Sequence, residues 1–319
     1  DHTASARGVK PLAVTVQAAR PLALPRETGQ KGAMSRPLWL IAAPFLFLLL
    51  WSAGFALAKI GLRHAGPFTI LGLRYLIAVL VLLPLLPILK PSFPRGRAAL
   101  DIAVTGFLIQ VVYFCLCYAA FRLGVSAGGV AIIVCLQPIL VGLVAPRMVG
   151  EKVGLLRWVG LACGLSGALT VILSRSGIQA EPILGVLLAV GGLFGITSAT
   201  LYEKRFGVTH HPVPANMIQY AVGAIFTLPQ AWGLEGFQAD WTLELWGVMA
   251  YLVIGNSLVA ISLLLAMIRA GEVARVSSLF YLVPPLSALF AWPLLGEAMP
   301  PLAWTGMGLA AVGVVLARK

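Results

Sequence analysis

The chain is built from long apolar stretches that alternate with short clusters of charged residues, proline and glycine. Within each stretch the apolar residues are continuous and do not alternate with polar ones, which favours helices over the strands of a barrel. A helix needs about 20 apolar residues to cross the hydrocarbon core of a bilayer. The pattern therefore predicts ten membrane-spanning helices, over residues 38–59, 68–89, 99–121, 125–147, 153–173, 182–203, 213–234, 244–268, 272–295 and 299–317.

The composition points to an all-α integral membrane protein. Of the 319 residues, 60% are hydrophobic and only 11% are charged. A soluble globular chain carries about 25% charged residues, so both a water-soluble domain and a disordered polymer are excluded. The four cysteines lie in apolar stretches without metal-ligand spacing, and we expect them to pack as small apolar residues.

The second half of the chain repeats the first. A shift of 145 residues aligns the early predicted helices and a shift of 146 aligns the later ones, pairing Tyr75 with Tyr220, Pro138 with Pro284, Glu151 with Glu297 and Trp158 with Trp304. We therefore predict two five-helix repeats, over residues 38–176 and 180–319. Because five is odd, the second repeat starts on the opposite side of the membrane. Inverted repeats of this kind surround the central binding cavity of many secondary transporters.

The positions of the basic residues predict the orientation in the membrane. The net charge is +12, which on a soluble chain would suggest a nucleic-acid partner. Here eighteen of the 23 basic residues fall on one side of the predicted helices, and four fall on the other. Residues 1–37 contribute to the larger group and are predicted to form a flexible basic tail. The positive-inside rule then places both termini in the cytoplasm, and no nucleic-acid partner is expected.

Several of these stretches resemble a known family. The segment WSAGFALAKIGLRHAGPFTILGLRYLIAVLVLLPLL (residues 51–86) is similar to the drug/metabolite transporter superfamily, in its ten-helix bacterial EamA type. So is the twice-used pattern of a helix with a central proline, a Gly-Glu pair and a glycine-rich last helix. The resemblance spans residues 38–319. It implies a basket of ten helices in the bacterial inner membrane, with helices 1, 3, 4, 6, 8 and 9 around a cavity. It also implies export of amino acids, drugs or related metabolites.

A group of polar and aromatic residues lies at the centres of the predicted helices. Transporter sites lie near the bilayer midplane, where a polar group without a partner is costly. The central residues that we expect to bind substrate are Trp51, Gln110, Tyr113, Gln137, Asn256 and Tyr281. Gln110 and Asn256 are equivalent under the shift of 146. Hydrogen bonds between helices and simple aromatic packing are the alternative roles for these side chains.

Three prolines interrupt the fourth and ninth predicted helices at equivalent depth: Pro138, Pro284 and Pro285. A proline inside a helix frees a backbone carbonyl and allows a bend, so these positions are candidate gating hinges. A bend that only shapes the bundle is the alternative.

The ionisable residues inside the predicted helices suggest the energetics of transport. Arg74 lies about 9 Å into the second helix, and we expect it to snorkel outward in a structural role. None of the eleven acidic residues lies at the centre of a helix. Proton-driven transporters commonly keep a carboxylate within the membrane. We therefore predict facilitated transport rather than carboxylate-coupled proton exchange.

An enzyme is the main alternative of another class. Residues 124–128 match the G-x-S-x-G nucleophile pattern, but they lie at a loop and no histidine or aspartate within the membrane could act as the base. We expect no catalytic residue, metal or cofactor. The small residues Gly160 and Gly164 predict close helix contacts, inside the bundle or in a weak homodimer, so the chain is expected to be a monomer or weak homodimer.

These features together predict a secondary transporter. We expect it to export small amphipathic metabolites by alternating access, with neutral or aromatic amino acids as the best candidates. Efflux or uptake of drugs or nucleoside-type metabolites is the alternative within the class, and a non-transporting scaffold is the alternative outside it.

Overall fold

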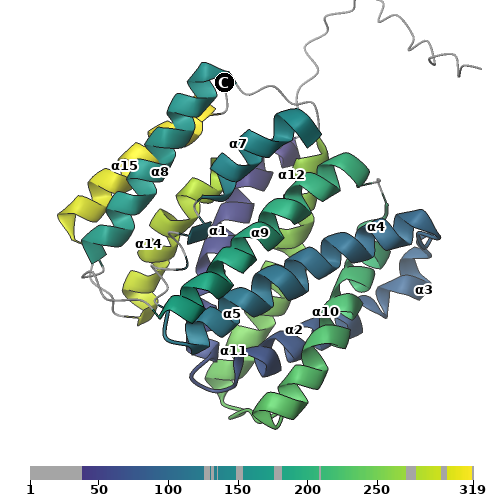
Figure 1. Ribbon diagram of the computed structural model, residues 1–319. Helices are drawn as coiled ribbons and strands as arrows, with labels where there is room; N and C mark the ends of the chain where they lie inside the picture. Colours follow the sequence, from purple (N-terminus) through teal and green to yellow (C-terminus); the bar gives the residue numbers. More distant parts are fainter. Residues whose placement is uncertain are drawn as a thin grey trace, which may run out of the picture. The chain divides into compact units, whose positions relative to one another are not determined.

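Apolar helices make up nearly all of the described chain, because continuous apolar segments can satisfy their backbone only within themselves in lipid (Figure 1). The computed structural model describes residues 38–125, 130, 133–134, 136–148, 154–175, 182–207, 210–270, 278–295 and 300–317. The predicted tail at 1–37 lies outside these residues. The elements are α1 (Leu38–Gly61), α2 (Pro67–Leu82), α3 (Leu85–Leu89), α4 (Arg97–Gly106), η1 (Phe107–Tyr113), α5 (Phe114–Arg122), α7 (Gln137–Met148), α8 (Leu155–Arg175), α9 (Ile183–Phe206), α10 (Pro212–Glu235), α11 (Leu243–Ala250), η2 (Tyr251–Ala260), α12 (Ile261–Ala270), η3 (Ser278–Leu282), α14 (Val283–Leu295) and α15 (Pro301–Ala317).

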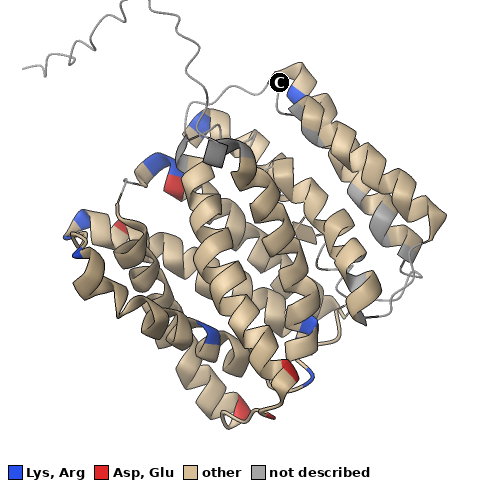
Figure 2. Cartoon of the chain, turned by 180° about the vertical axis from the view of Figure 1, so that it is seen from behind, with Lys and Arg blue, Asp and Glu red and all other residues tan. Residues whose placement is uncertain are grey.

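Within the part of the chain that the structure describes, five helical stretches are long and apolar enough to cross a membrane. They are Ala42–Gly61, Pro67–Leu89, Arg97–Arg122, Ile183–Phe206 and Leu243–Ile268. About half of each stretch is buried inside the protein, so the other half presents apolar side chains outward. Figure 2 shows charged residues mainly near the helix ends, with mostly uncharged helical segments between them. A helix that is apolar on every side is suited to a bilayer. The remaining predicted spans stay predictions.

Helices from the two halves of the chain pack against each other in pairs. In the described residues α2 packs against α10, and α8 packs against α15. The α1 helix packs against α14 and η2, and α9 packs against α7, η1 and α5. In the described residues α2, α8, α10 and α15 thus each make most of their contacts with a helix of the other half.

The contact between α8 and α15 depends on small residues. A Cβ atom on Gly167 would clash with the backbone of Gly306 and Ala310, and one on Gly313 would clash with that of Gly160 and Gly164. The two contacts are equivalent under the shift of 146, which pairs Gly167 with Gly313, Gly306 with Gly160 and Ala310 with Gly164. The predicted close approach of these small residues is confirmed, and it occurs within the chain.

Two long helices contain a segment of π-helix. η1 lies between α4 and α5, and η2 lies between α11 and α12. Their π-turns include Gln110 and Asn256, the two amides that are equivalent in the repeat. A π-helix has a wider turn than an α-helix, and such segments are frequent at functional sites.

The prolines lie where helical segments begin. The α7 helix starts at Gln137, one residue before Pro138. At the equivalent place a 3₁₀ segment ends at Leu282, and α14 starts one residue before Pro284. Proline is well accommodated in a first helical turn, where its missing N–H has no partner to lose. The prolines were predicted to lie inside helices that they interrupt. In the structure they lie in the first turn of α7 and of α14.

Candidate functional site

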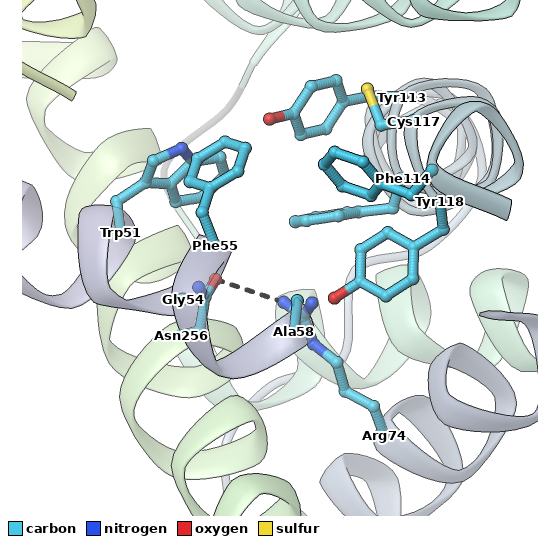
Figure 3. A pocket seen from close by; sticks show the side chains of 11 residues that line it. Trp51, Gly54, Phe55, Ala58, Arg74, Tyr113, Phe114, Cys117, Tyr118 and Asn256 are labelled. Atoms are coloured by element: carbon cyan, nitrogen blue, oxygen red, sulfur yellow. Dashed lines mark hydrogen bonds between the residues drawn. The ribbon is translucent and has the colours of Figure 1, made fainter. Parts of the chain in front are cut away.

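A pocket lies between α1, α2, η2 and the segment formed by η1 and α5 (Figure 3). Most of its lining is aromatic, and the aromatic residues are Trp51, Phe55, Tyr113, Phe114, Tyr118 and Phe121. Arg74 and Asn256 add a positive charge and an amide to this lining, and the hydroxyls of Tyr113 and Tyr118 add polar groups to two of its rings. The pocket therefore places flat apolar surfaces beside polar groups that include one positive charge.

Arg74 lines the pocket and has no exposed surface. Its Nε donates a hydrogen bond to Ser257 Oγ at 2.5 Å, and its Nη2 donates to Asn256 Oδ1 at 3.3 Å. The guanidinium also lies 4.5 Å from the ring centroid of Phe114, within the range of a cation–π contact. Both hydrogen-bond acceptors are neutral. No carboxylate forms an ion pair with Arg74 among the described residues.

Gly54 allows Asn256 to reach the arginine. A Cβ atom at position 54 would clash with Asn256 Nδ2. Without that atom, the amide of Asn256 lies against α1 and directs its oxygen toward Arg74 (Figure 3). Gly54 of α1 is therefore required for the polar end of the pocket.

The aromatic wall of the pocket is centred on Trp51. Its ring stacks on Tyr113 with the centroids 6.3 Å apart and the planes 15° apart, and it lies 5.9 Å from the ring of Phe114. Phe280 meets Trp51 edge-on from outside the pocket, with the centroids 5.9 Å apart. These contacts restrict the Trp51 and Tyr113 rings and leave a wall of aromatic surface beside the arginine.

The predicted substrate-binding residues divide into two groups. Trp51, Tyr113 and Asn256 line the pocket. Gln110, Gln137 and Tyr281 are fully buried elsewhere.

Each residue of the second group lies in a different setting. Gln110 keeps both polar atoms of its side chain without a hydrogen-bond partner in the described structure. Gln137 donates from Nε2 to Thr200 Oγ1 at 3.2 Å. Tyr281 packs directly against Gly164 of α8. Depth along the helix is therefore not enough to select pocket residues.

The expectation for Arg74 was wrong. It does not snorkel outward, because its side chain finds Ser257, Asn256 and the face of Phe114 inside the bundle. One sequence signal pointed to this outcome. The shift of 145 that pairs Tyr75 with Tyr220 also pairs Arg74 with Gln219, so both repeats place a polar residue at this depth.

The additional pocket residues of α5 also had a sequence signal. Tyr113, Phe114, Cys117, Tyr118 and Phe121 recur at intervals of three and four residues, the spacing of one helix face. Only Tyr113 of this group was predicted. The stripe is visible in the sequence, but it does not reveal whether the face meets lipid, another helix or a pocket.

Two buried carboxylates lie in the bundle away from the pocket. Glu203 of α9 accepts a hydrogen bond from Thr105 Oγ1 at 3.1 Å, and Asp101 of α4 accepts one from the Tyr202 hydroxyl at 2.7 Å. Among the described residues no group of three histidine, cysteine or acidic side chains could hold a metal ion. Ser126 of the G-x-S-x-G match lies outside the described residues.

Known proteins share the sequence over most of its length. An inner membrane transporter of Escherichia coli K12, named "Uncharacterized inner membrane transporter YedA", is 26% identical over 282 residues, which cover 87% of this chain and 90% of that protein. A "Probable amino-acid metabolite efflux pump" of Salmonella typhimurium is 25% identical, covering 85% of this chain and 90% of the pump. A solved crystal structure has the same fold, with a TM-score of 0.74 and 21% identity, covering 88% of this chain and 97% of that chain.

The family match is direct and occurs twice. The EamA-like transporter family matches residues 37–173 and again residues 183–318. These two matches together cover well over half of the chain, and they confirm the resemblance noted from residues 51–86. The chain belongs to the EamA-like transporter family and is a membrane transporter of the drug/metabolite type.

Proposed function

We propose that this transporter exports small amphipathic metabolites, with neutral or aromatic amino acids as its substrates, across the bacterial inner membrane. The pocket beside Trp51 and Arg74 carries the proposal, because it offers both an aromatic wall and polar groups to one small molecule. The name of the Salmonella relative gives independent support for amino-acid metabolites. That of the Escherichia coli relative supports the inner membrane.

We further propose alternating access between two inverted five-helix repeats, over residues 38–176 and 180–319. Two observations support this arrangement. The contacts of Gly167 and Gly313 exchange under the shift of 146, as a pseudo-two-fold axis requires. The α2–α10 and α8–α15 pairs each join equivalent helices. Secondary transporters with such repeats change access by moving one repeat against the other.

The proposed substrate site includes the lining residues Trp51, Tyr113 and Asn256. Alternating access requires a second conformation, open to the other side of the membrane. Gln110, Gln137 and Tyr281 are proposed to reach substrate in that second conformation. The unpartnered amide of Gln110 supports this role, since it is equivalent to Asn256 in the repeat. The helix starts at Gln137 and Val283 support hinges at Pro138, Pro284 and Pro285, because the hydrogen-bond pattern changes there.

A counterflow screen in liposomes tests the function. Purified protein in liposomes loaded with one unlabelled amino acid at a time should accumulate the same labelled amino acid, for at least one neutral or aromatic member of the twenty. Liposomes without protein give the background. Failure of every amino acid, together with accumulation of a drug or nucleoside, would replace the proposed substrate class.

A further inference from the structure

We propose that Arg74 binds the carboxylate of the substrate in this pocket. The substrates would then be small carboxylates with an apolar or aromatic part. This inference rests on the proposed function, since it identifies the group that the same pocket recognises.

The positive charge of Arg74 calls for an anionic partner. The guanidinium is fully buried, and no carboxylate of the described residues pairs with it. Burying an unpaired charge is costly, and buried charges in proteins are usually paired. Ser257 and Asn256 supply only neutral oxygens to the cation. An anionic ligand at this place would supply the missing charge.

Arg74 also has a hydrogen-bond donor that is not used within the described residues. Nη1 of Arg74 is buried and has no hydrogen-bond partner among the described residues. Nε and Nη2 each donate to a neutral oxygen, which fixes the guanidinium, while the two N–H bonds of Nη1 stay available. Figure 3 shows the guanidinium between the side chains of Asn256 and Tyr118, on the lining of the pocket. An arginine fixed in this way suits a carboxylate, to which its N–H groups form charge-assisted hydrogen bonds.

An aromatic surface lies in the same pocket as Arg74. Trp51 and Tyr113 line the same pocket and are held against each other by stacking. A molecule whose carboxylate meets Arg74 would place its apolar part against these rings. Inorganic anions would use the charge but not the wall, so the pocket favours an organic carboxylate.

Of the two equivalent residues Arg74 and Gln219, only Arg74 carries a charge. Gln219 is equivalent to Arg74 and is also buried, yet it does not line the pocket. If a polar residue at this depth were needed only for packing, a neutral amide would serve in both repeats. Gln219 also provides a matched position for a control variant.

Binding to the purified full chain tests the carboxylate directly. The probes are 3-phenylpropionate, which has only the carboxylate, and phenethylamine, which has only the amine. From ligand-dependent shifts in the thermal unfolding midpoint, we expect the carboxylate to bind about ten- to hundredfold more tightly, the range of one charged hydrogen bond. In Arg74→Gln this preference should fall to within about twofold, whereas Gln219→Leu should keep it. Arg74→Lys, which retains the charge, should keep part of it.

Several results would overturn the inference. Equal binding of the two probes would do so, as would no binding of 3-phenylpropionate or an unchanged preference in Arg74→Gln. If chloride bound to the site as strongly as 3-phenylpropionate does, at constant ionic strength, the site would be one for inorganic anions. If Arg74→Gln is unstable, the Arg74→Lys variant and the probe comparison on the unaltered chain still decide the question.

Transport measurements separate this inference from the proposed function. Equal flux of phenylalanine and phenylalaninamide through the unaltered protein would refute carboxylate recognition and leave amino-acid transport standing. No amino-acid flux, with carboxylate binding that still depends on Arg74, would refute the function and leave the carboxylate site standing.

Discussion

The rings of Tyr75 and Tyr220 stack on each other inside the bundle, with their centroids 5.9 Å apart and their planes 22° apart. They occupy equivalent positions on α2 and α10, and each hydroxyl donates to a backbone carbonyl of a π-helical segment. Tyr75 donates to Gln110 at 2.8 Å, and Tyr220 donates to Ser257. The pair therefore links the two halves of the chain to both π-helices.

Removing either hydroxyl should destabilise the protein by a similar amount. Tyr75→Phe and Tyr220→Phe each delete one buried hydrogen bond and keep the ring contact, which should cost about 1–2 kcal/mol. Thermal unfolding of the detergent-solubilised variants measures the effect. Loss of stability in only one of them would contradict an equivalent role for the two tyrosines.

A methyl group at Gly54 should impair the site without unfolding the chain. In Gly54→Ala the new Cβ displaces the side chain of Asn256, and with it the acceptor of Arg74 Nη2. We expect transport to fall by about tenfold or more, since one hydrogen bond to a charged group is worth about 1.5–3 kcal/mol. Gly247→Ala is the control, because a Cβ there meets no atom within 4 Å. Equal activity of both variants would argue against a role for Asn256.

Replacing the two equivalent amides together should abolish transport. The Gln110→Leu/Asn256→Leu variant removes both proposed polar contacts, while leucine has a volume close to that of glutamine and the same branched heavy-atom outline as asparagine. Flux in liposomes measures activity, and a single symmetric peak in size-exclusion chromatography shows that the protein remains folded. Unchanged flux would refute the assignment of both amides to the site.

The single variants of this pair should differ. Asn256 lines the pocket and contacts Arg74, whereas Gln110 does neither in the described conformation. Asn256→Leu should therefore weaken binding of 3-phenylpropionate more than Gln110→Leu does. A stronger effect of Gln110→Leu on binding would indicate that, in detergent, the protein is mainly in the second conformation of the transport cycle and not in the described one.

A proton gradient should not drive the transport. The pocket has no carboxylate in its lining, and the buried Glu203 and Asp101 have their partners elsewhere in the bundle. Substrate flux should be about the same with and without an imposed pH gradient, when both measurements use the same internal pH. Strong acceleration by the gradient would show proton coupling and would direct attention to those two carboxylates.

Helix type and approximate bounds could be predicted from the sequence because they depend on local apolar length. The segment predicted at 182–203 corresponds to α9, which spans Ile183–Phe206, and that at 213–234 corresponds to α10, which spans Pro212–Glu235. The two π-helices and the 3₁₀ segment before Pro284 were not predicted. They depend on contacts between distant helices, such as the hydrogen bond from Tyr75 to the Gln110 carbonyl.

The pocket was only partly predictable for a related reason. Central position in a helix identified Trp51, Tyr113 and Asn256, but it does not determine which side of the helix a residue faces. That is why Gln137 pairs with Thr200 outside the pocket. The inward direction of Arg74 follows from acceptors more than 180 residues away in the chain. Distant partners of this kind leave no local pattern.

The backbone contact between α8 and α15 has an evolutionary consequence. Gly167 lies against Gly306 and Ala310, and Gly313 lies against Gly160 and Gly164. No residue is smaller than glycine, so a larger side chain at Gly167 or Gly313 cannot be compensated by a change at a glycine on the other side. Each half of the gene thus restricts the mutations that the other half can accept. After the duplication, the two copies could diverge more freely elsewhere than at this contact between α8 and α15.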